Sequence, residues 1–425
     1  MNRNINHNMK MNTKMNTKTK KLPKTAPALL CSTLLAALGL MVAVPAEARG
    51  YTPKGTCEGF PKVDIKAPAG FCVALVADER QGLKFPRRMV EVAPNRFWIV
   101  DMGGWTKGAG KLFEMTLKPG GAAPELKTLA SGLDRPHGLA IGPDGKAYVA
   151  EATRILRSPT SGWAQEVVID KLPGDGSHPL KEIAFGGKDG GKLYVNVGSF
   201  SDSCKNDAQQ QPQPCPEVQG DKPRAAVYEA VLGKDGALQS FKPFATGLRN
   251  SMALAVYQQA GQPDIVLQGE NSIDYPDVGV PHEELNILQA GGNYGWPYCV
   301  ENQQPARGYE KYDCKPTKAP AALWPAHTAP LQMLVAPAGS LPWSGQLVVA
   351  WHGYKPAGQR VMAFKLDGAG KPAGSGTEIL GNWTAQTGVR PQGAPTGVTV
   401  GSDGRLFVLE DRNRTLLMLG RENKP

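Results

Sequence analysis

The chain has 425 residues, and 48 Lys and Arg against 38 Asp and Glu give it a formal net charge of +10. Its 50 Gly and 36 Pro are spread without a low-complexity tract, which indicates many turns between short strands. No cluster of Lys and Arg alternates with aromatic residues, which argues against a nucleic-acid partner. No long window beyond the N-terminal region has the 3.6-residue apolar period of a helix, so we expect a mostly β protein.

Residues 1–48 are predicted to be an export signal. Seven basic residues and no acidic residue precede an apolar run from Ala26 to Val44, and Pro45-Ala46-Glu47-Ala48 forms an A-x-A cleavage pattern. An uncleaved membrane anchor is the alternative, because the apolar run approaches spanning length. Pro45 and the small residues favour cleavage after Ala48, which leaves no stable membrane span. Residues 49–425 would then form one domain with a net charge of +4, so the basicity belongs mostly to the leader.

Six cysteines beyond the leader fall into three pairs that are close along the chain. This spacing favours Cys57–Cys72, Cys204–Cys215 and Cys299–Cys314, although six cysteines allow other pairings. Local disulfides suit an oxidising compartment, which supports a periplasmic or secreted protein. No CxxC or Cys/His spacing points to a structural metal.

A strand–turn–strand pattern recurs along the chain, most clearly in SHPLKEIAFGGKDGGKLYVNVGS at residues 177–199. There, apolar residues alternate at period two on both sides of a Gly-rich turn, as in a β-hairpin. The related stretches begin at Met89, Gly138, Met252, Met333 and Gly397. Six repeated β units of this size predict a six-bladed β-propeller, with KLFEMTL and AAVYEAVL as outer strands. Two long insertions, Phe200–Arg224 and 271–329, are expected to be functional loops on the channel face.

Basic or amide residues stand before each repeated first strand. Because the innermost strands of a propeller line one channel, we expect these residues to surround a single pocket: Arg87 and Arg88, Arg135 and His137, His178, Arg249 and Asn250, His327, and Arg390. Arginine forks match carboxylates and phosphates, so the pattern indicates an anion with several such groups. For each residue taken alone, a purely structural role in a loop remains an alternative.

From about residue 130 to 420 the chain resembles the soluble quinoprotein glucose/sorbosone dehydrogenases, and is most similar to their L-sorbosone dehydrogenase-like branch. The matching motifs, in order, are SHPLKEIAFGGKDGGKLYVNVGS, RAAVYEA, ATGLRN, EELNILQAGGNYGWPYC, AHTAPL, VVAWHGYK and the Arg-Pro before the last repeat. GLRN followed by ELN and GNYGWP is the most specific part. The calcium loop departs from the NERD-like run of that branch and reads Asn-Ser-Ile-Asp at residues 271–274.

The resemblance implies a propeller that binds pyrroloquinoline quinone (PQQ) and Ca²⁺ on the channel face. It makes His178 the general base that takes a proton from a sugar hydroxyl, and it places Arg249 and Asn250 at the quinone oxygens. It also implies that Lys355 and Arg390 bind the cofactor carboxylates, with His137 as a secondary contact. Calcium would be bound by backbone carbonyls around Ser272 and Ile273. Tyr294 and Trp296 of GNYGWP are expected to pack rather than to contact substrate.

The implied function is a PQQ- and calcium-dependent dehydrogenase that oxidises an aldose sugar or a sorbosone-like aldehyde. Without a CxxCH motif no c-type haem is attached, so electrons would pass to an external acceptor such as a quinone or a soluble cytochrome. A calcium-dependent lactonase-type propeller is an alternative, but it would need side-chain metal ligands where these strand starts offer Arg and His. A non-catalytic binding propeller is a further alternative.

Overall fold

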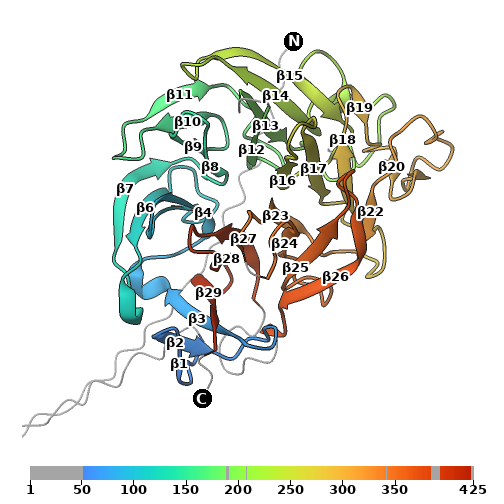
Figure 1. Cartoon of the computed structure of the whole chain (residues 1–425). Helices are drawn as coiled ribbons and strands as arrows, with labels where there is room; N and C mark the ends of the chain where they lie inside the picture. Colours follow the sequence, from blue (N-terminus) through green and yellow to red (C-terminus); the bar gives the residue numbers. More distant parts are fainter. Residues whose placement is uncertain (1–50, 188–190, 207, 341, 384–392, 423–425) are drawn as a thin grey trace, which may run out of the picture. The chain divides into compact units, whose positions relative to one another are not determined.

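Six antiparallel β-sheets surround a central channel in the computed structural model, and their innermost strands face one another across it (Figure 1). The structure describes residues 51–422 except 188–190, 207, 341 and 384–392. The predicted leader therefore lies outside the described residues. Among the residues described, no helix is long and apolar enough to cross a membrane.

The innermost and second strands of the six blades are the six hairpins predicted from the sequence. The innermost strands, from blade 1 to blade 6, are β4 (Pro86–Ala93), β8 (Leu139–Ile141), β12 (Ile183–Gly186), β16 (Ala253–Tyr257), β23 (Pro330–Val335) and β27 (Pro395–Val400). The second strands are β5 (Arg96–Asp101), β9 (Ala147–Ala150), β13 (Lys192–Val197), β17 (Ile265–Glu270), β24 (Leu347–Trp351) and β28 (Leu406–Glu410). The prediction of an all-β, six-bladed propeller is confirmed.

Each sheet is completed by a third and an outer strand. The third strands are β6 (Gly110–Thr116), β10 (Ile155–Ser158), β14 (Ala226–Leu232), β18 (Glu283–Leu288), β25 (Arg360–Leu366) and β29 (Thr415–Arg421). The outer strands are β7 (Leu126–Leu133), β11 (Glu166–Ile169), β15 (Leu238–Thr246), β22 (Ala322–Trp324), β26 (Pro372–Leu380) and β3 (Phe71–Ala77). Short additions are β1 (Thr56–Cys57), β2 (Phe60–Val63), β19 (Gly292–Asn293), β20 (Cys299–Val300) and β21 (Gln304–Pro305), with single 3₁₀ turns at Glu79–Gln81, Pro119–Gly121 and Pro216–Val218.

Blade 6 is built from both ends of the domain. Its outer strand β3 comes first in the chain and pairs antiparallel with β29, the last strand, from Phe71 opposite Arg421 to Ala77 opposite Leu416. The Cys57–Cys72 disulfide joins β1 to β3 beside this pairing. The ring is therefore closed by hydrogen bonds between the first and last parts of the domain.

The core consists of apolar layers between neighbouring blades. Along β28, Leu406 and Val408 pack toward blade 5, whereas Phe407 and Leu409 pack toward blade 1. Similar layers lie between the other blades. Because successive side chains point to opposite faces of a strand, and both faces are covered by a neighbouring blade, these strands are apolar on both sides.

Two insertions pack together beyond blades 3 and 4. Residues 198–225 contribute the Cys204–Cys215 disulfide, and the segment after β18 contributes Cys299–Cys314, and both lie in one buried cluster with Trp296. The Tyr298 hydroxyl accepts a 2.6 Å hydrogen bond from the Cys215 backbone N–H, which links the two insertions. All three predicted disulfide pairings are confirmed.

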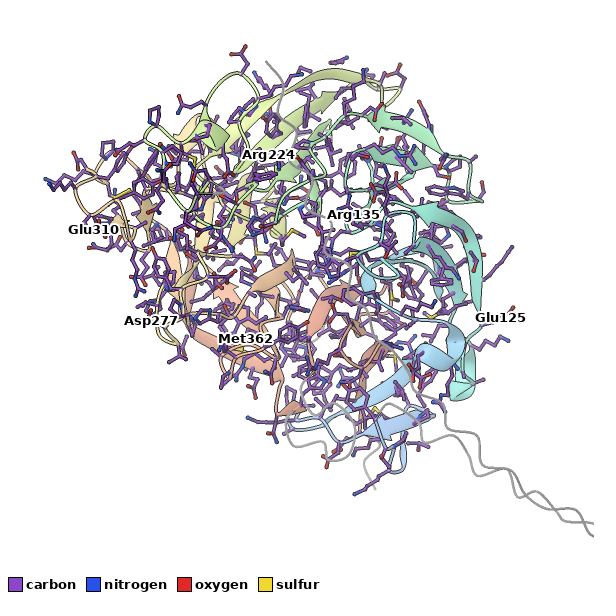
Figure 2. The ribbon with its side chains drawn as sticks, turned by 180° about the vertical axis from the view of Figure 1, so that it is seen from behind. Glu125, Arg135, Arg224, Asp277, Glu310 and Met362 are labelled. Carbon is purple, nitrogen blue, oxygen red and sulfur yellow. A yellow bond between two sulfur atoms is a disulfide. The ribbon has the colours of Figure 1, made fainter. Side chains whose placement is uncertain are left out.

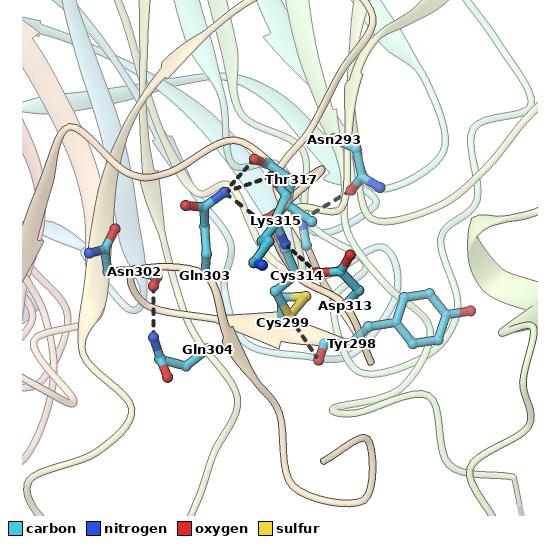
Figure 3. Close-up of a disulfide and its surroundings, with 11 residues drawn as sticks. Asn293, Tyr298, Cys299, Asn302, Gln303, Gln304, Asp313, Cys314, Lys315 and Thr317 are labelled. Carbon is cyan, nitrogen blue, oxygen red and sulfur yellow. Dashed lines mark hydrogen bonds between the residues drawn. A yellow bond between two sulfur atoms is a disulfide. The ribbon is translucent and has the colours of Figure 1, made fainter. Parts of the chain in front are cut away.

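The sequence predicted one continuous loop over residues 271–329. The structure differs, because β18 and β22 of blade 4 lie within this range and divide it. Around Cys299–Cys314, the Gln303 side chain donates to the backbone carbonyls of Thr317 at 2.8 Å and Lys315 at 3.1 Å (Figure 3). Glu310 lies at the outer edge of this insertion in the view from behind (Figure 2). The insertion is thus fixed by a disulfide and by side chain–backbone hydrogen bonds.

Candidate active site

His178 lies in the connection between β11 and β12, on the face of the propeller where the innermost strands begin. Its Nδ1 is 2.8 Å from the Ser199 hydroxyl and 3.1 Å from the Ser199 carbonyl. That hydroxyl donates its own proton to the Ser201 carbonyl at 2.6 Å, so both Ser199 oxygens are acceptors toward His178. Nδ1 must therefore carry the proton, which leaves the Nε2 lone pair available as a base.

The environment of His178 favours the neutral imidazole. Burial and, to a smaller extent, the positive charge of Arg249 together lower the pKa of His178 to about 3. A neutral ring with a lone pair at Nε2 is the form that a general base requires.

The backbone packs closely around this histidine. A Cβ atom added to Gly198 would lie 2.5 Å from the His178 Cβ and 3.5 Å from the Asn250 Oδ1. This places Asn250 beside His178, although the two belong to neighbouring blades. The Asn250 Oδ1 is buried without a hydrogen-bond partner among the described residues. An unsatisfied amide next to a candidate base is typical of a site that receives a ligand.

Arg249 is next to Asn250, and its backbone carbonyl accepts the Ser199 N–H at 2.8 Å. Its guanidinium is held by two carboxylates, because one nitrogen lies 2.7 Å from both an Asp202 and an Asp274 oxygen. Nε also donates to the Asp202 carbonyl and the other terminal nitrogen donates to the Asn271 carbonyl. Four of the five N–H groups of Arg249 therefore have acceptors among the described residues, and the fifth has none there and can serve a ligand.

The loop after β17 contains the predicted calcium carbonyls. The Ser272 N–H donates to the Glu283 carboxylate at 2.5 Å, and the Ile273 carbonyl accepts the Tyr275 N–H at 2.9 Å. The Asp274 N–H donates to Asp202 at 3.0 Å. Burial raises the pKa of Glu283 to about 7. Ser272 and Ile273 thus lie beside a buried carboxyl group in a loop that is tied to Arg249.

Arg88 occupies the centre of the channel and is fully buried. Its guanidinium forms an ion pair with Glu182 of blade 3 and contacts the His137 ring of blade 2 and the carbonyls of Met252, Leu331 and Thr396 from blades 4, 5 and 6. It also donates to the carbonyl of Arg87 in its own blade. The sequence predicted that Arg88 belongs to the ring of ligand-binding cations. In the structure its hydrogen bonds instead link the six blades. Below it, the inner strands line a cavity of about 560 Å³ at the other end of the channel.

His137 belongs to the same central group. Its Nε2 lies 2.8 Å from an Arg88 nitrogen, and because a guanidinium only donates, Nε2 is an acceptor and Nδ1 carries the proton. The Nδ1 atom is buried without a hydrogen-bond partner in the described part of the chain. Burial, together with the charges of Arg88 and Arg87, holds the pKa of His137 well below its usual value. His137 is therefore a neutral donor with an unused N–H.

The other expected cations are paired as well. Arg87 lies 3.0 Å from Asp411, which also lies 3.1 Å from the His352 Nε2. Burial opposes ionisation of Asp411, but the charges of His352 and Arg87 hold its pKa below its ordinary value. Arg135 pairs with the adjacent Asp134.

Comparison with known proteins places the chain in a family. The family model for "Glucose / Sorbosone dehydrogenase" matches residues 146–419, which is more than half of the chain. The chain belongs to the glucose/sorbosone dehydrogenase family. The match contains His178, Arg249, Asn250 and the loop at residues 271–274.

Solved structures share the fold of this glucose/sorbosone dehydrogenase family member. The holo form of the pyranose dehydrogenase PQQ domain from Coprinopsis cinerea is 20% identical, with a TM-score of 0.67, over 86% of this chain and 99% of that one. A calcium structure of a Trichoderma reesei carbohydrate-active enzyme of family AA12 is 18% identical, with a TM-score of 0.67, over 87% and 98%. The apo form of the soluble aldose sugar dehydrogenase from Escherichia coli is 18% identical, with a TM-score of 0.52, over 82% and 99%.

A curated relative is an uncharacterised protein from Synechocystis sp. (strain ATCC 27184 / PCC 6803 / Kazusa), which is 29% identical over 143 residues. That match covers 32% of this dehydrogenase-family chain, and the chain spans only 30% of the length of the relative.

Some of the site residues predicted for this glucose/sorbosone dehydrogenase family member are not shown to lie next to His178. Lys355 is exposed in the loop after β24, and none of the ion pairs among the described residues involves it. Arg390 lies outside the described residues. His327 is tied to the blade 4 loop, because its Nε2 is 2.6 Å from the Asp277 carbonyl. Tyr294 and Trp296 are buried, as expected, and the Trp296 indole N–H donates to the Asp202 carbonyl at 2.9 Å.

Acidic residues that organise this site were missed in the sequence. In four blades an acid at the end of the second strand, or directly after it in blade 2, accepts a backbone N–H from the loop that enters the first strand of the same blade. The pairs are Asp101 from Lys84, Glu151 from Asp134, Glu270 from Asn250, and Glu410 from Ala394. The repeated endings WIVD, YVAE, LQGE and VLE were a visible signal for this role. These carboxylates fix the channel-face loops that carry the site.

Proposed function

We propose that this chain is a periplasmic or secreted PQQ- and calcium-dependent dehydrogenase that oxidises an aldose sugar or a sorbosone-like aldehyde, with His178 as the general base. The observation that carries the proposal is the neutral His178, whose Nδ1 proton is fixed by Ser199 and whose Nε2 has no hydrogen-bond partner among the described residues. Asn250, whose Oδ1 is also without a partner there, lies against the same Gly198. Family membership supports sugar oxidation as the reaction class. The three disulfides are consistent with an oxidising compartment.

The residues around the site fit an anionic quinone. Within the described part of the chain, the Asn250 side-chain N–H groups, one N–H of Arg249 and the buried Nδ1–H of His137 have no acceptor, so each can donate to an oxygen of the cofactor. Exposed Lys355 would add a positive charge for a carboxylate, and Arg390 is proposed for the same task. A solved structure of similar fold is named as the holo form of a PQQ domain, which supports this choice of cofactor.

When bound, PQQ would supply an ortho-quinone that accepts the hydride leaving the sugar carbon. His178 Nε2 takes the hydroxyl proton, so the C–O bond of the substrate can become a carbonyl. Ser199 holds the imidazole in the required tautomer throughout. Arg249, which its protein acceptors hold in place, and Asn250 would donate to oxygen atoms on which negative charge develops.

For calcium, the Ser272 and Ile273 carbonyls and the neighbouring Glu283 carboxylate are oxygen ligands of the kind that Ca²⁺ prefers. Burial raises the pKa of Glu283 to about 7, and a divalent cation bound beside it would favour the ionised carboxylate. Electrons would leave to a separate acceptor, a quinone or a soluble cytochrome.

The test is a titration of the purified apoprotein with PQQ and Ca²⁺, followed by absorption spectroscopy and by dye-linked oxidation of aldoses. We expect stoichiometric PQQ binding and sugar oxidation that falls by about 10² or more in His178→Ala. Lys355→Ala should weaken PQQ binding, whereas Lys365→Ala, at an exposed position on β25, should not. Failure to bind PQQ at micromolar concentration would reject the proposal.

A further inference from the structure

A histidine–carboxylate pair, His352 and Asp411, lies on the channel face outside the group around His178. His352 directly follows β24 of blade 5, and Asp411 directly follows β28 of blade 6. In both blades the second strand ends opposite the first residue of the innermost strand. The pair therefore lies at the end of the propeller where the innermost strands begin, which is also the end that carries His178.

The geometry of the pair is that of a general base and the acid that orients it. The His352 Nε2 lies 3.1 Å from an Asp411 oxygen. Although burial opposes ionisation of Asp411, the charges of His352 and Arg87 hold its pKa below its ordinary value, so the carboxylate accepts and Nε2 carries the proton. The His352 Nδ1 has no hydrogen-bond partner among the described residues, so its lone pair is available.

Burial differs between the two side chains in a way that suits proton transfer. The Asp411 side chain is 2% exposed, whereas that of His352 is 15% exposed. A buried carboxylate fixes the tautomer of the imidazole and stabilises the imidazolium that forms when Nδ1 accepts a proton. Because the ring is partly exposed, that proton has a path to solvent.

The pair borders the mouth of the channel. Arg87 lies 3.0 Å from the second Asp411 oxygen, and the next residue, Arg88, occupies the centre of the channel. Blade 6 lies across the ring from blade 3 (Figure 1), so Asp411 and His178 are on opposite sides of the channel. The titratable and charged groups around the pair are Arg87, His137, Tyr354, Glu410 and Arg412.

The proposed reaction has a place for a second base. Oxidation of a sugar hydroxyl to a carbonyl releases two protons and two electrons. His178 takes the hydroxyl proton, and the carbon-bound hydrogen leaves as a hydride, which is one proton with two electrons. An acceptor that takes electrons alone, such as a soluble cytochrome, leaves the proton of the hydride in the site.

We propose that His352, oriented by Asp411, is the second proton acceptor of the reaction and takes the proton of the hydride at Nδ1 when the two electrons pass to an electron-only acceptor. The proton then leaves to solvent. The proposal rests on the proposed function and adds the class of acceptor to it, which is a carrier that takes electrons without protons rather than a quinone.

The first test uses the apoprotein, without PQQ or calcium. Nitrogen-15 NMR of histidine-labelled protein, with His352→Gln to assign the signal, should show neutral His352 with its proton on Nε2. This is the opposite tautomer from that of His178. A proton on Nδ1 would overturn the proposal, because the nitrogen that is free of Asp411 would then not be basic.

The second test separates the two halves of the reaction by stopped-flow absorption spectroscopy of protein loaded with PQQ and Ca²⁺. In His352→Ala, reduction by an aldose should keep the wild-type rate. Reoxidation by ferricyanide, which takes electrons alone, should slow by about 10², and added imidazole should restore much of that rate. Reoxidation by a quinone, which takes up protons with its electrons, should stay near the wild-type rate.

His282→Gln is the matched control, since it removes another imidazole that lies 2.9 Å from a carboxylate, that of Glu301. Reoxidation of His352→Ala by ferricyanide at the wild-type rate would overturn this inference alone, because His178 would then serve for both protons. Equal losses in reduction and reoxidation, without rescue by imidazole, would overturn it in favour of a structural role. A wild-type protein that no aldose reduces would instead reject the proposed function, and the inference with it.

Discussion

Arg88 and Glu182 form an ion pair at the centre of the propeller, although 94 positions separate them in the chain. Arg88 extends from the innermost strand of blade 1, and Glu182 directly precedes that of blade 3. Burial raises the pKa of Glu182, and the charge of Arg88 opposes that shift. The removal of one partner from a buried ion pair destabilises the folded protein, because the remaining charge is buried without compensation.

Arg88→Met should therefore destabilise the domain by about 3–5 kcal/mol, because Glu182 would remain buried without its partner. Urea unfolding followed by circular dichroism would measure this. Arg80→Met, which removes a solvent-exposed guanidinium from its pair with Asp78, should change stability by less than about 1 kcal/mol. Adding Glu182→Gln to Arg88→Met should restore part of the loss, and an Arg88→Met protein as stable as the wild type would contradict this role for the pair.

Ser199→Ala should lower kcat/KM for sugar oxidation by roughly five- to ten-fold, the value of one hydrogen bond. The loss is limited because the Ser199 carbonyl still accepts the His178 Nδ1 proton at 3.1 Å. Nitrogen-15 NMR of histidine-labelled protein would report the tautomer directly. A wild-type spectrum with the proton of His178 on Nε2 would contradict the assignment.

Gly198→Ala should reduce activity by about 10² while the domain stays folded, because the new methyl group would displace His178. The added Cβ would meet the His178 carbonyl oxygen at 2.7 Å. Gly162→Ala is the control, since a Cβ there meets nothing within 4 Å. Melting temperature and sugar oxidation would be measured for both variants. Full activity in Gly198→Ala would show that His178 is not so tightly placed.

Glu410 should make stability fall as pH rises. Burial raises its pKa in the folded state to about 8, with Asp411 adding to the shift, whereas an unfolded glutamate titrates near its ordinary value. Between these values the folded protein retains a proton that the unfolded chain has lost, so the carboxyl group opposes folding increasingly up to about pH 8. His178 acts in the opposite direction, since its depressed pKa costs stability only as pH falls below the ordinary histidine value toward 3.

Urea unfolding of the wild type and Glu410→Gln at several pH values from 6.5 to 8.5 would separate the two effects. The wild type should lose more stability than the variant across this range. Identical slopes for the two proteins would show that Glu410 ionises normally in the fold.

The sequence predicted the six hairpins because alternation at period two is a local signal, and both faces of β12–β13 and its equivalents are covered by neighbouring blades. It also identified His178 and Asn250 as neighbours of the channel. It did not reveal that Asp202, Asp411 and Glu182 neutralise the expected cations, because these pairs join residues from different blades and no local pattern records such contacts. The division of residues 271–329 by β18 was missed because EELNIL carries Glu and Asn on a face that the fold buries.

The pairing of β3 with β29 also sets when the propeller can close. Among the described strands β29 is the last to be synthesised, and until it pairs with β3 blade 6 lacks its third strand and its outer strand has no partner in that sheet. Joining residues some 350 positions apart carries a large loop-closure cost, so closure is a late and slow step. A chain truncated before β29 would keep every residue of the candidate site. It would still lack the strand pairing that closes the ring and positions those residues.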